Sequence, residues 1–265
     1  MIKPVNFSSE YKSFRKILKA KAAELHNELG SKVDINPTSK KLCRKNGIKT
    51  ETANIVNTAD YLKAVYKLIK SKGYKLPGVC IDESIIPRES RLGGIQQGNW
   101  NIFGPGKLDI YTPSIIIHEE GHFLHTKNMW YNQGLYAMFN SFRSIFRPFL
   151  NKKEKEIFLK DIKRAYNEGY FSDMQLDKCL KKGYINKQIL DEFNKKPETF
   201  LSKNAFTSVD EFIAEYFALA AQGFKFSQEI TKRYKSFHGP DIKNIITKSE
   251  INNLIALRKE LERRV

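Results

Sequence analysis

The sequence has few cysteines and no long apolar run, and each absence excludes a class of protein. Its 265 residues include three cysteines, Cys43, Cys80 and Cys179, which lie far apart and form no Cys-x-x-Cys pair. An odd number of cysteines scattered along the chain indicates reduced thiols. It excludes both a disulfide framework and a zinc site built from paired cysteines. The longest run of isoleucine, leucine and valine is Ile115-Ile116-Ile117, far short of the roughly 20 residues that span a bilayer. Any metal site must therefore use histidine and carboxylate side chains, and no membrane span is expected.

The first residues of the chain also lack an apolar stretch that could serve as a secretory signal. We therefore expect a protein that is cytoplasmic or is delivered without a classical signal peptide. Association with a virion is compatible with the same observation.

Basic residues outnumber acidic ones, and the excess is concentrated in the first third of the chain. The formal net charge is +17, and residues 1–75 hold 17 basic and 6 acidic side chains. Such a segment favours contact with an acidic partner or nucleic acid, although a lysine-rich face that only keeps the protein in solution fits equally well. Many lysines with few arginines favour diffuse attraction over base readout, and no RNA-recognition, zinc-finger or helix-turn-helix pattern is present.

Hydrophobic periodicity and turn residues predict a mostly helical α+β protein with a small mixed sheet. Val79-Cys80-Ile81 is typical of a buried strand, and residues 100–103 and 108–111, joined by a Gly-Pro-Gly-Lys turn, predict a hairpin. Residues 36–57 are expected to be irregular. The helices are expected at residues 9–29, from 58 or 60 to 72, from 113 onward, and near 133–149, 152–167, 173–182, 185–195, 208–222, 226–236 and 248–263.

The helix that begins at Pro113 contains the sequence His118-Glu119-Glu120-Gly121-His122. Histidines four residues apart project from one helix face, so both imidazoles can meet a single Zn²⁺ at about 2.0–2.1 Å. Glu119 lies beside them, where it can take a proton from a water molecule on the metal. Two neutral histidines stacked in a core would be the ordinary structural explanation. The otherwise apolar helix favours one zinc ion per chain.

Two histidines leave a catalytic zinc short of a third protein ligand. His125 lies on nearly the same face but about 10 Å along the axis from His118, so it suits a supporting or packing role rather than ligation. His238 is a weaker candidate. Glu211 and Glu215 are better, because they lie four residues apart on an otherwise apolar helix, where buried carboxylates need a positive partner. One could bind the metal and the other could orient a histidine, unless the two form an ordinary solvated pair.

The two motifs together resemble a known family. His118-Glu-x-Gly-His122 followed by Glu211-Phe-Ile-Ala-Glu215-Tyr-Phe is similar to the gluzincin metalloproteases, most closely to the lethal-factor-like catalytic domains of bacterial toxins and of phage or mobile-element proteins. The resemblance covers roughly residues 76–238. It implies that His118, His122 and Glu211 hold the metal, that Glu119 is the general base, and that Glu215 supports a ligating histidine.

The sequence departs from the family pattern at one functional position. The family often has a tyrosine seven residues before the ligating glutamate, where it helps to stabilise the oxyanion, and here that position is Asn204. An asparagine amide can still donate a hydrogen bond to an oxyanion, so Asn204 is the candidate for this role. Tyr111, Tyr216 and Tyr234 are alternatives between which the sequence does not choose.

The resemblance implies a zincin-like core and three parts of the chain. These are a basic helical segment over residues 1–75, a metalloprotease domain over 76–240 and a C-terminal helix over 241–265. The function implied is a zinc endopeptidase that acts on a protein or peptide, in a toxin or phage setting. Residues 100–103 or 93–97 could offer an edge to which an extended substrate adds as a strand.

Two other functions remain open at this stage. A protease tethered to nucleic acid, of the SprT-like kind, would explain the basic charge, but such proteins take a third histidine shortly downstream and none lies between His125 and His238. A non-catalytic structural or virion-associated protein that keeps the zincin core would explain the missing tyrosine and the long interval between His122 and Glu211.

Overall fold

The computed structural model describes residues 7–87, 94–106, 108, 112–132, 149–170, 187–188, 191, 195 and 204–264. Within them the fold is α+β and mostly helical, with one small mixed sheet, as the sequence predicts. The elements are α1 (Phe7–Leu29), β1 (Val33–Ile35), α2 (Lys40–Asn46), α3 (Ile48–Ser71), β2 (Gly78–Ile81), β3 (Ile95–Gln97), β4 (Trp100–Phe103), α4 (Pro113–Asn132), α6 (Lys152–Asn167), the 3-10 helix η1 (Asn204–Phe206), α10 (Val209–Ala221), α11 (Gln228–Ser236) and α12 (Lys248–Arg263).

The sheet has the strand order β1-β2-β4-β3. Strands β1, β2 and β4 are parallel, and β3 pairs with β4 in the antiparallel direction. The antiparallel partner of β4 is thus residues 95–97, which come before it in the chain, whereas residues 109–111 of the expected hairpin lie outside the described part. Because β4 lies between β2 and β3, residues 100–103 offer no free edge, and the expectation that they could do so is wrong. Among the described strands, β3 is the outermost on this side.

Most of the described helices match the sequence-based expectations. Helices α6 and α12 begin and end as predicted, and α1, α10 and α11 differ from prediction by two residues or fewer at either end. The irregular segment expected over residues 36–57 is wrong, because α2 and the first turns of α3 occupy it. The expected helices at 133–149, 173–182 and 185–195 fall almost entirely outside the described residues.

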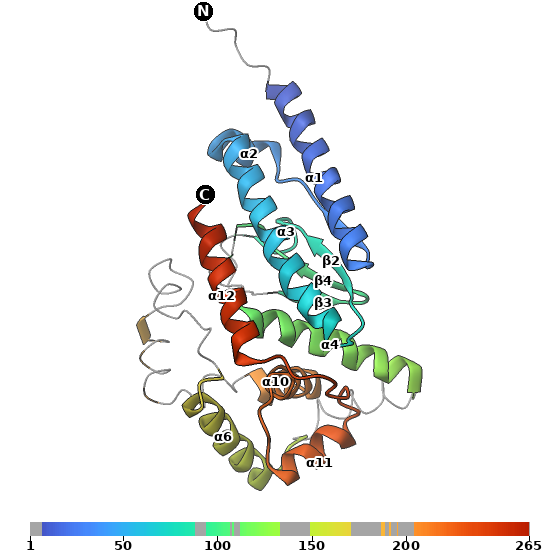
Figure 1. The fold of residues 1–265 in the computed structure, drawn as a ribbon. Helices are drawn as coiled ribbons and strands as arrows, with labels where there is room; N and C mark the ends of the chain where they lie inside the picture. Colours follow the sequence, from blue (N-terminus) through green and yellow to red (C-terminus); the bar gives the residue numbers. More distant parts are fainter. Residues whose placement is uncertain are drawn as a thin grey trace, which may run out of the picture.

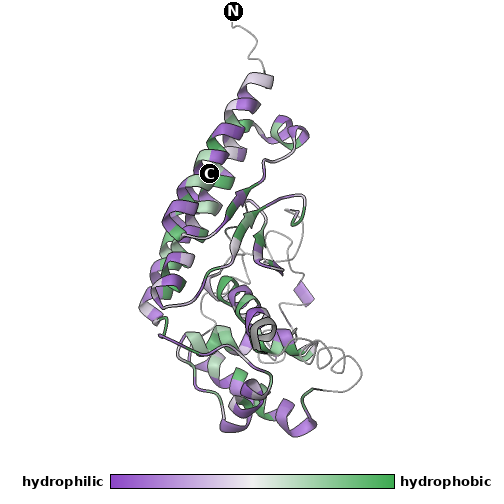
Figure 2. Ribbon diagram, turned by 90° about the vertical axis from the view of Figure 1, so that its right-hand side faces the viewer, coloured by the Kyte–Doolittle hydropathy of each residue, from purple (hydrophilic) through white to green (hydrophobic). Residues whose placement is uncertain are grey.

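Helices α1, α3 and α12 lie on one side of the sheet (Figure 1). Helix α4 crosses below the sheet in the view of Figure 1. One hydrophobic cluster joins them and runs from Phe14 in α1 to Leu261 in α12, with Tyr66 of α3, Ile81 of β2 and Ile117 of α4 between them. In Figure 2 hydrophilic and hydrophobic residues alternate along the long helices, as expected for helices that bury one side. This core therefore crosses the boundaries expected at residues 75 and 240.

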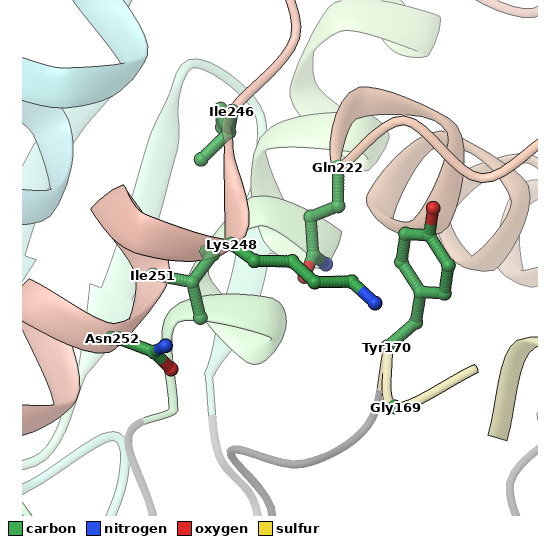
Figure 3. A pocket seen from close by; sticks show the side chains of 7 residues that line it. All are labelled: Gly169, Tyr170, Gln222, Ile246, Lys248, Ile251 and Asn252. Atoms are coloured by element: carbon green, nitrogen blue, oxygen red, sulfur yellow. The ribbon is translucent and has the colours of Figure 1, made fainter. Parts of the chain in front are cut away.

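A second hydrophobic cluster lies between α6, α10 and α11 and is rich in aromatic rings. Tyr216 of α10 stacks on Phe226 and on Tyr234, with ring centroids 4.2 and 3.8 Å apart. A small pocket of about 70 Å³ opens beside it, among Gly169, Tyr170, the end of α10 and the start of α12 (Figure 3). That volume suits a few water molecules rather than a peptide.

No described helix is long and apolar enough to cross a membrane. Cys43 and Cys80 are buried and form no disulfide among the described residues, whereas Cys179 lies outside them.

Candidate metal centre

Helix α4 places two imidazoles on one face. The Thr112 hydroxyl accepts a hydrogen bond from the Ile115 backbone N–H and caps the helix, and Pro113 takes the first helical position. Four residues apart, His118 and His122 then bring their Nε2 atoms to 3.1 Å. Both histidines are only partly exposed.

Helix α10 supplies the third side chain. The Ser208 hydroxyl accepts from the Glu211 backbone N–H at 3.1 Å and caps this helix, which sets Glu211 in its first turn. Oε2 of Glu211 lies 3.3 Å from Nε2 of His118, and Oε1 of Glu211 lies 3.5 Å from Nε2 of His122. One potential ligand atom from each of the three side chains lies within 4.8 Å of the other two, so together they form a candidate metal site.

The two helices approach closely at a glycine. Contact between α4 and α10 is the most extensive between any two described elements. A Cβ on Gly121 would lie 3.0 Å from the Cα atom of Ala214 and 3.1 Å from a ring carbon of Phe217. Glycine at this position therefore allows the separation at which Glu211 reaches the histidines.

The charges of the three side chains depend on one another. Burial opposes protonation of His118, but the carboxylates of Glu211 and Glu215 outweigh it and raise its pKa to about 10. Burial likewise disfavours the charged form of Glu211, yet the two imidazoles hold its pKa well below the usual range. Because an imidazole must be neutral to ligate a metal, binding of a cation here would release a proton.

Glu215 contacts the histidine that Glu211 also contacts. Its carboxylate oxygen lies 3.4 Å from Nδ1 of His118, on the ring atom opposite the one that faces Glu211. A carboxylate in this place fixes the tautomer and the ring orientation of a ligating histidine. The spacing of Glu211 and Glu215 left open which carboxylate would contact the metal. The family resemblance assigned Glu211 to the metal and Glu215 to a ligating histidine, and this assignment stays a prediction.

Glu119 lies between the metal centre and the edge strand. Its side chain is 8% exposed, and the Gln96 backbone N–H in β3 donates a hydrogen bond to it. A Cβ on Gly94 would lie 2.9 Å from Cγ of Glu119, so the strand backbone rests against this side chain. Burial raises the pKa of Glu119, while the imidazoles of His118 and His122 act in the opposite direction. Both effects suit a group that exchanges a proton.

His125 does not face the ligand set. Its Nδ1 lies 2.9 Å from a carboxylate oxygen of Asp210, and its Nε2 lies 2.9 Å from the backbone carbonyl oxygen of Phe237. The ring is 1% exposed and connects α4 with the start of α10 and the end of α11. The hydrogen bond with His125 outweighs burial and lowers the pKa of Asp210. Sequence reasoning gave His125 a supporting or packing role but missed Asp210, which no local pattern distinguishes from a solvated acid.

A second buried acid was also missed. Glu120 is fully buried, and neither oxygen of its carboxyl group has a hydrogen-bond partner among the described residues. Burial raises its pKa well above the usual value, against a weaker opposite effect of Lys127. Its charge acts on Tyr66 of α3, so it lies on the core side of α4.

The candidates for oxyanion stabilisation are not resolved by the fold. Asn204 is the first residue of η1, which leads into α10, and its role stays a prediction. The Tyr216 hydroxyl donates to the Thr231 hydroxyl and the Tyr234 hydroxyl to the Pro240 carbonyl oxygen, so both are engaged in the second core. Tyr111 lies outside the described residues.

No protein-family model matches this chain, and no curated protein or solved structure is similar enough to count as a match.

Proposed function

We propose that this protein is a zinc-dependent endopeptidase with a zincin-like core. The observation that carries the proposal is the spacing of the three potential ligand atoms of His118, His122 and Glu211, which all lie within 4.8 Å of one another. The gluzincin-like order of the motifs, with the histidines on one helix and the glutamate on a later one, supports the same function.

Zinc at such a site is a Lewis acid that polarises a carbonyl group and lowers the pKa of water. Glu119 is the general base: its carboxylate takes a proton from the attacking water and passes it to the leaving amine. Its place between the histidines and β3 puts it beside both the metal and a strand edge. Glu215 holds the His118 ring in the orientation that presents Nε2 to the metal.

The outer side of β3 suits an extended substrate. Strand β3 is the last of the described strands on this side of the sheet, and its Gln96 backbone contacts Glu119. A peptide that pairs with this edge would run past the general base. The substrate class is therefore an extended stretch of polypeptide rather than a small molecule.

The test compares metal content and peptidase activity in matched variants. In Glu119→Gln we expect about one zinc per chain, as in the wild type, and a loss of activity of roughly 10²–10⁴-fold, because only the proton transfer is removed. In His118→Ala and Glu211→Ala we expect the zinc itself to be lost. Glu156→Gln, an exposed acid on α6, is the control and should change neither quantity.

Elemental analysis of purified protein and mass spectrometry of cleaved peptide mixtures give the two readouts. Full activity of Glu119→Gln would contradict the proposed base. Bound zinc with no peptidase activity in the wild type would instead favour a structural or virion-associated protein that keeps the metal for stability.

A further inference from the structure

A second, larger hollow lies away from the candidate metal centre. It has a volume of about 500 Å³, within the range of small-molecule sites. It forms where the end of α1, the end of α3, the beginnings of β2 and β4 and the middle of α4 meet. Four lysines, Lys32, Lys70, Lys75 and Lys127, are among the residues that line it, and none of the lining residues is acidic.

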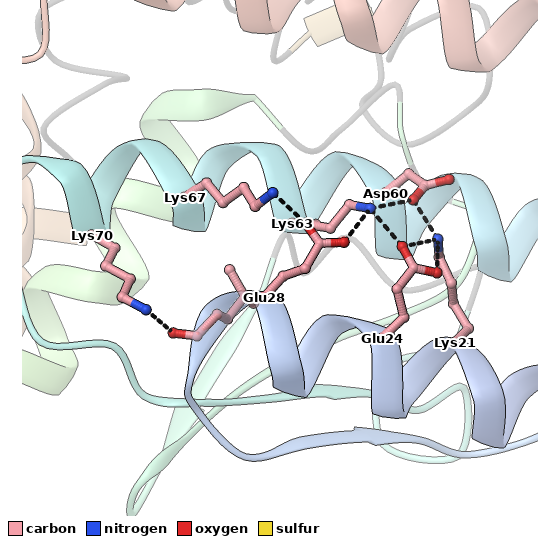
Figure 4. Close-up of polar contacts among 8 residues, drawn as sticks. Lys21, Glu24, Glu28, Asp60, Lys63, Lys67 and Lys70 are labelled. Carbon is pink, nitrogen blue, oxygen red and sulfur yellow. Dashed lines mark hydrogen bonds and ion pairs between the residues drawn. The ribbon is translucent and has the colours of Figure 1, made fainter.

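The lysines that lie earlier in α3 form ion pairs with carboxylates, in contrast to the lysines that line the hollow. In Figure 4, Lys63 and Lys67 reach Glu24 and Glu28 of α1, and Lys63 also lies near Asp60 of α3 itself. The next lysine on this face, Lys70, donates a hydrogen bond to a backbone carbonyl oxygen rather than to a carboxylate.

No carboxylate pairs with a lysine of the hollow at ion-pair distance in the described part of the chain. Lys70 donates to the carbonyl oxygen of Leu29 at 2.7 Å, and the ammonium of Lys127 lies 4.5 Å from the ring centroid of Phe123. Lys32 and Lys75 are exposed. Lys127 lowers the pKa of the buried Glu120, but by less than burial raises it. The hollow is therefore a region of unbalanced positive charge.

Two glycines shape its wall. Gly30 has a φ of +68°, and a Cβ there would lie 3.3 Å from the ammonium of Lys70. Gly78 lies directly under Trp100, where a Cβ would come within 2.5 Å of a ring carbon of the indole. The absence of side chains lets the Lys70 ammonium reach the end of α1 and lets the Trp100 ring lie flat against β2.

The hollow and the candidate metal centre use different sides of α4. Phe123 and Lys127 line the hollow, whereas His118 and His122 face α10. At 100° per residue, Lys127 projects roughly opposite to the midpoint of the two histidines. A ligand in the hollow would leave the metal centre open.

We propose that this hollow binds a small, multiply charged phosphate compound. Lysine ammonium groups are point charges that suit phosphate oxygens from several directions, and four of them can balance a polyanion that no carboxylate competes for. The concave shape and volume favour a compound the size of a nucleotide over an extended nucleic-acid strand. The indole of Trp100 adds an aromatic surface at the edge of the charged group.

Isothermal titration of the full chain with sodium tripolyphosphate tests the proposal. We expect saturable binding at one site, weakened at higher salt. Lys32→Ala and Lys75→Ala should each weaken it about tenfold, because each removes one charged contact. Both lysines are exposed and without an ion pair in the described structure, so the fold should be unaffected. ATP and adenosine, titrated in parallel, show whether the phosphates alone bind or the base adds to them.

The control is Lys12→Ala combined with Lys16→Ala, which removes two exposed charges about 20 Å away along α1. Equal weakening by this variant, or no saturable binding, would overturn the proposal in favour of diffuse attraction. Because tripolyphosphate also chelates zinc, the titration is repeated with His122→Ala, which lacks a proposed metal ligand. Binding that persists there is independent of the peptidase proposal.

Discussion

At the scale of single residues, Glu215 is the side chain that we expect to act on the proposed metal indirectly. It touches His118 on the ring nitrogen opposite the one that faces Glu211. In Glu215→Gln the amide can still occupy the space but no longer holds a negative charge against the ring. We expect zinc stoichiometry to remain near one and affinity to fall about 10–100-fold, measured by competition with a chelator.

Glu156→Gln again serves as the control for loss of one acidic group. Loss of stoichiometric zinc in Glu215→Gln would mean that Glu215 is itself a ligand, and unchanged affinity would mean that its contact with His118 does not orient the ring.

The residues of the candidate site were predictable where the chemistry is local. The spacing of His118 and His122 and the unusual acids on an apolar helix identified three groups that the structure brings together. Asp210 and Glu120 were missed for opposite reasons. Asp210 acts through a histidine 85 positions earlier in the chain, and Glu120 is part of the same motif but faces the core, which a motif does not reveal.

At the scale of elements, the contact between α4 and α10 determines whether the ligands meet. In Gly121→Ala the new methyl group would press on the backbone of Ala214 and on Phe217. An alanine normally stabilises a helix by about 1 kcal/mol relative to glycine. Here overpacking of roughly 1–3 kcal/mol opposes that gain, so we expect a net loss of stability and weaker zinc binding.

The predicted loss of stability is opposite in sign to the usual effect of placing an alanine in a helix. Ser13→Ala, an exposed substitution within α1, should show only the small gain from helix propensity. Thermal unfolding of both variants measures the effect. A Gly121→Ala variant that is more stable than the wild type would show that α4 and α10 can separate without loss.

The ends of helices could be predicted where the sequence contains recognisable capping residues. Thr247 and Glu250 form a capping box, and α12 begins and ends as expected. Helix α3 begins at Ile48, ten or twelve residues before the predicted start at 58 or 60, because its first turns are polar. Those turns are buried by tertiary contacts, as the burial of Glu51 and Asn57 shows. The parallel pairing of β1 with β2 joins segments more than 40 residues apart, and no local pattern encodes it.

At the scale of the whole molecule, residues 7–75 belong to the main core. Strand β1 pairs with β2, and Phe14, Tyr66 and Ile69 pack in the cluster that also contains α4 and α12. A chain that begins at residue 76 would lose this half of the core, and we expect it not to fold cooperatively. Circular dichroism and thermal unfolding of the truncated chain check this.

The same packing decides how a nucleic-acid tether should be tested. Deleting residues 1–75 would remove the fold together with the charge, so the informative comparison uses Lys12→Ala with Lys16→Ala, which lowers the charge and leaves the core intact. A truncated chain that unfolds cooperatively and retains zinc would show instead that the basic segment is a separate domain.

The packing of α4 against α10 also determines which changes in chain length the candidate site can tolerate. All three candidate ligands come from these two helices, yet nearly ninety residues separate His122 from Glu211 in the sequence. Helix α6 lies in this connection and packs against α10, where Phe158 contacts Phe212, so the second core holds this part. Once α4 and α10 pack, the spacing of the candidate ligands does not depend on the length of the rest of the connection. Doubling the length of a flexible loop costs only about 0.6 kcal/mol of closure entropy, so insertions outside α6 should leave the candidate ligands in place.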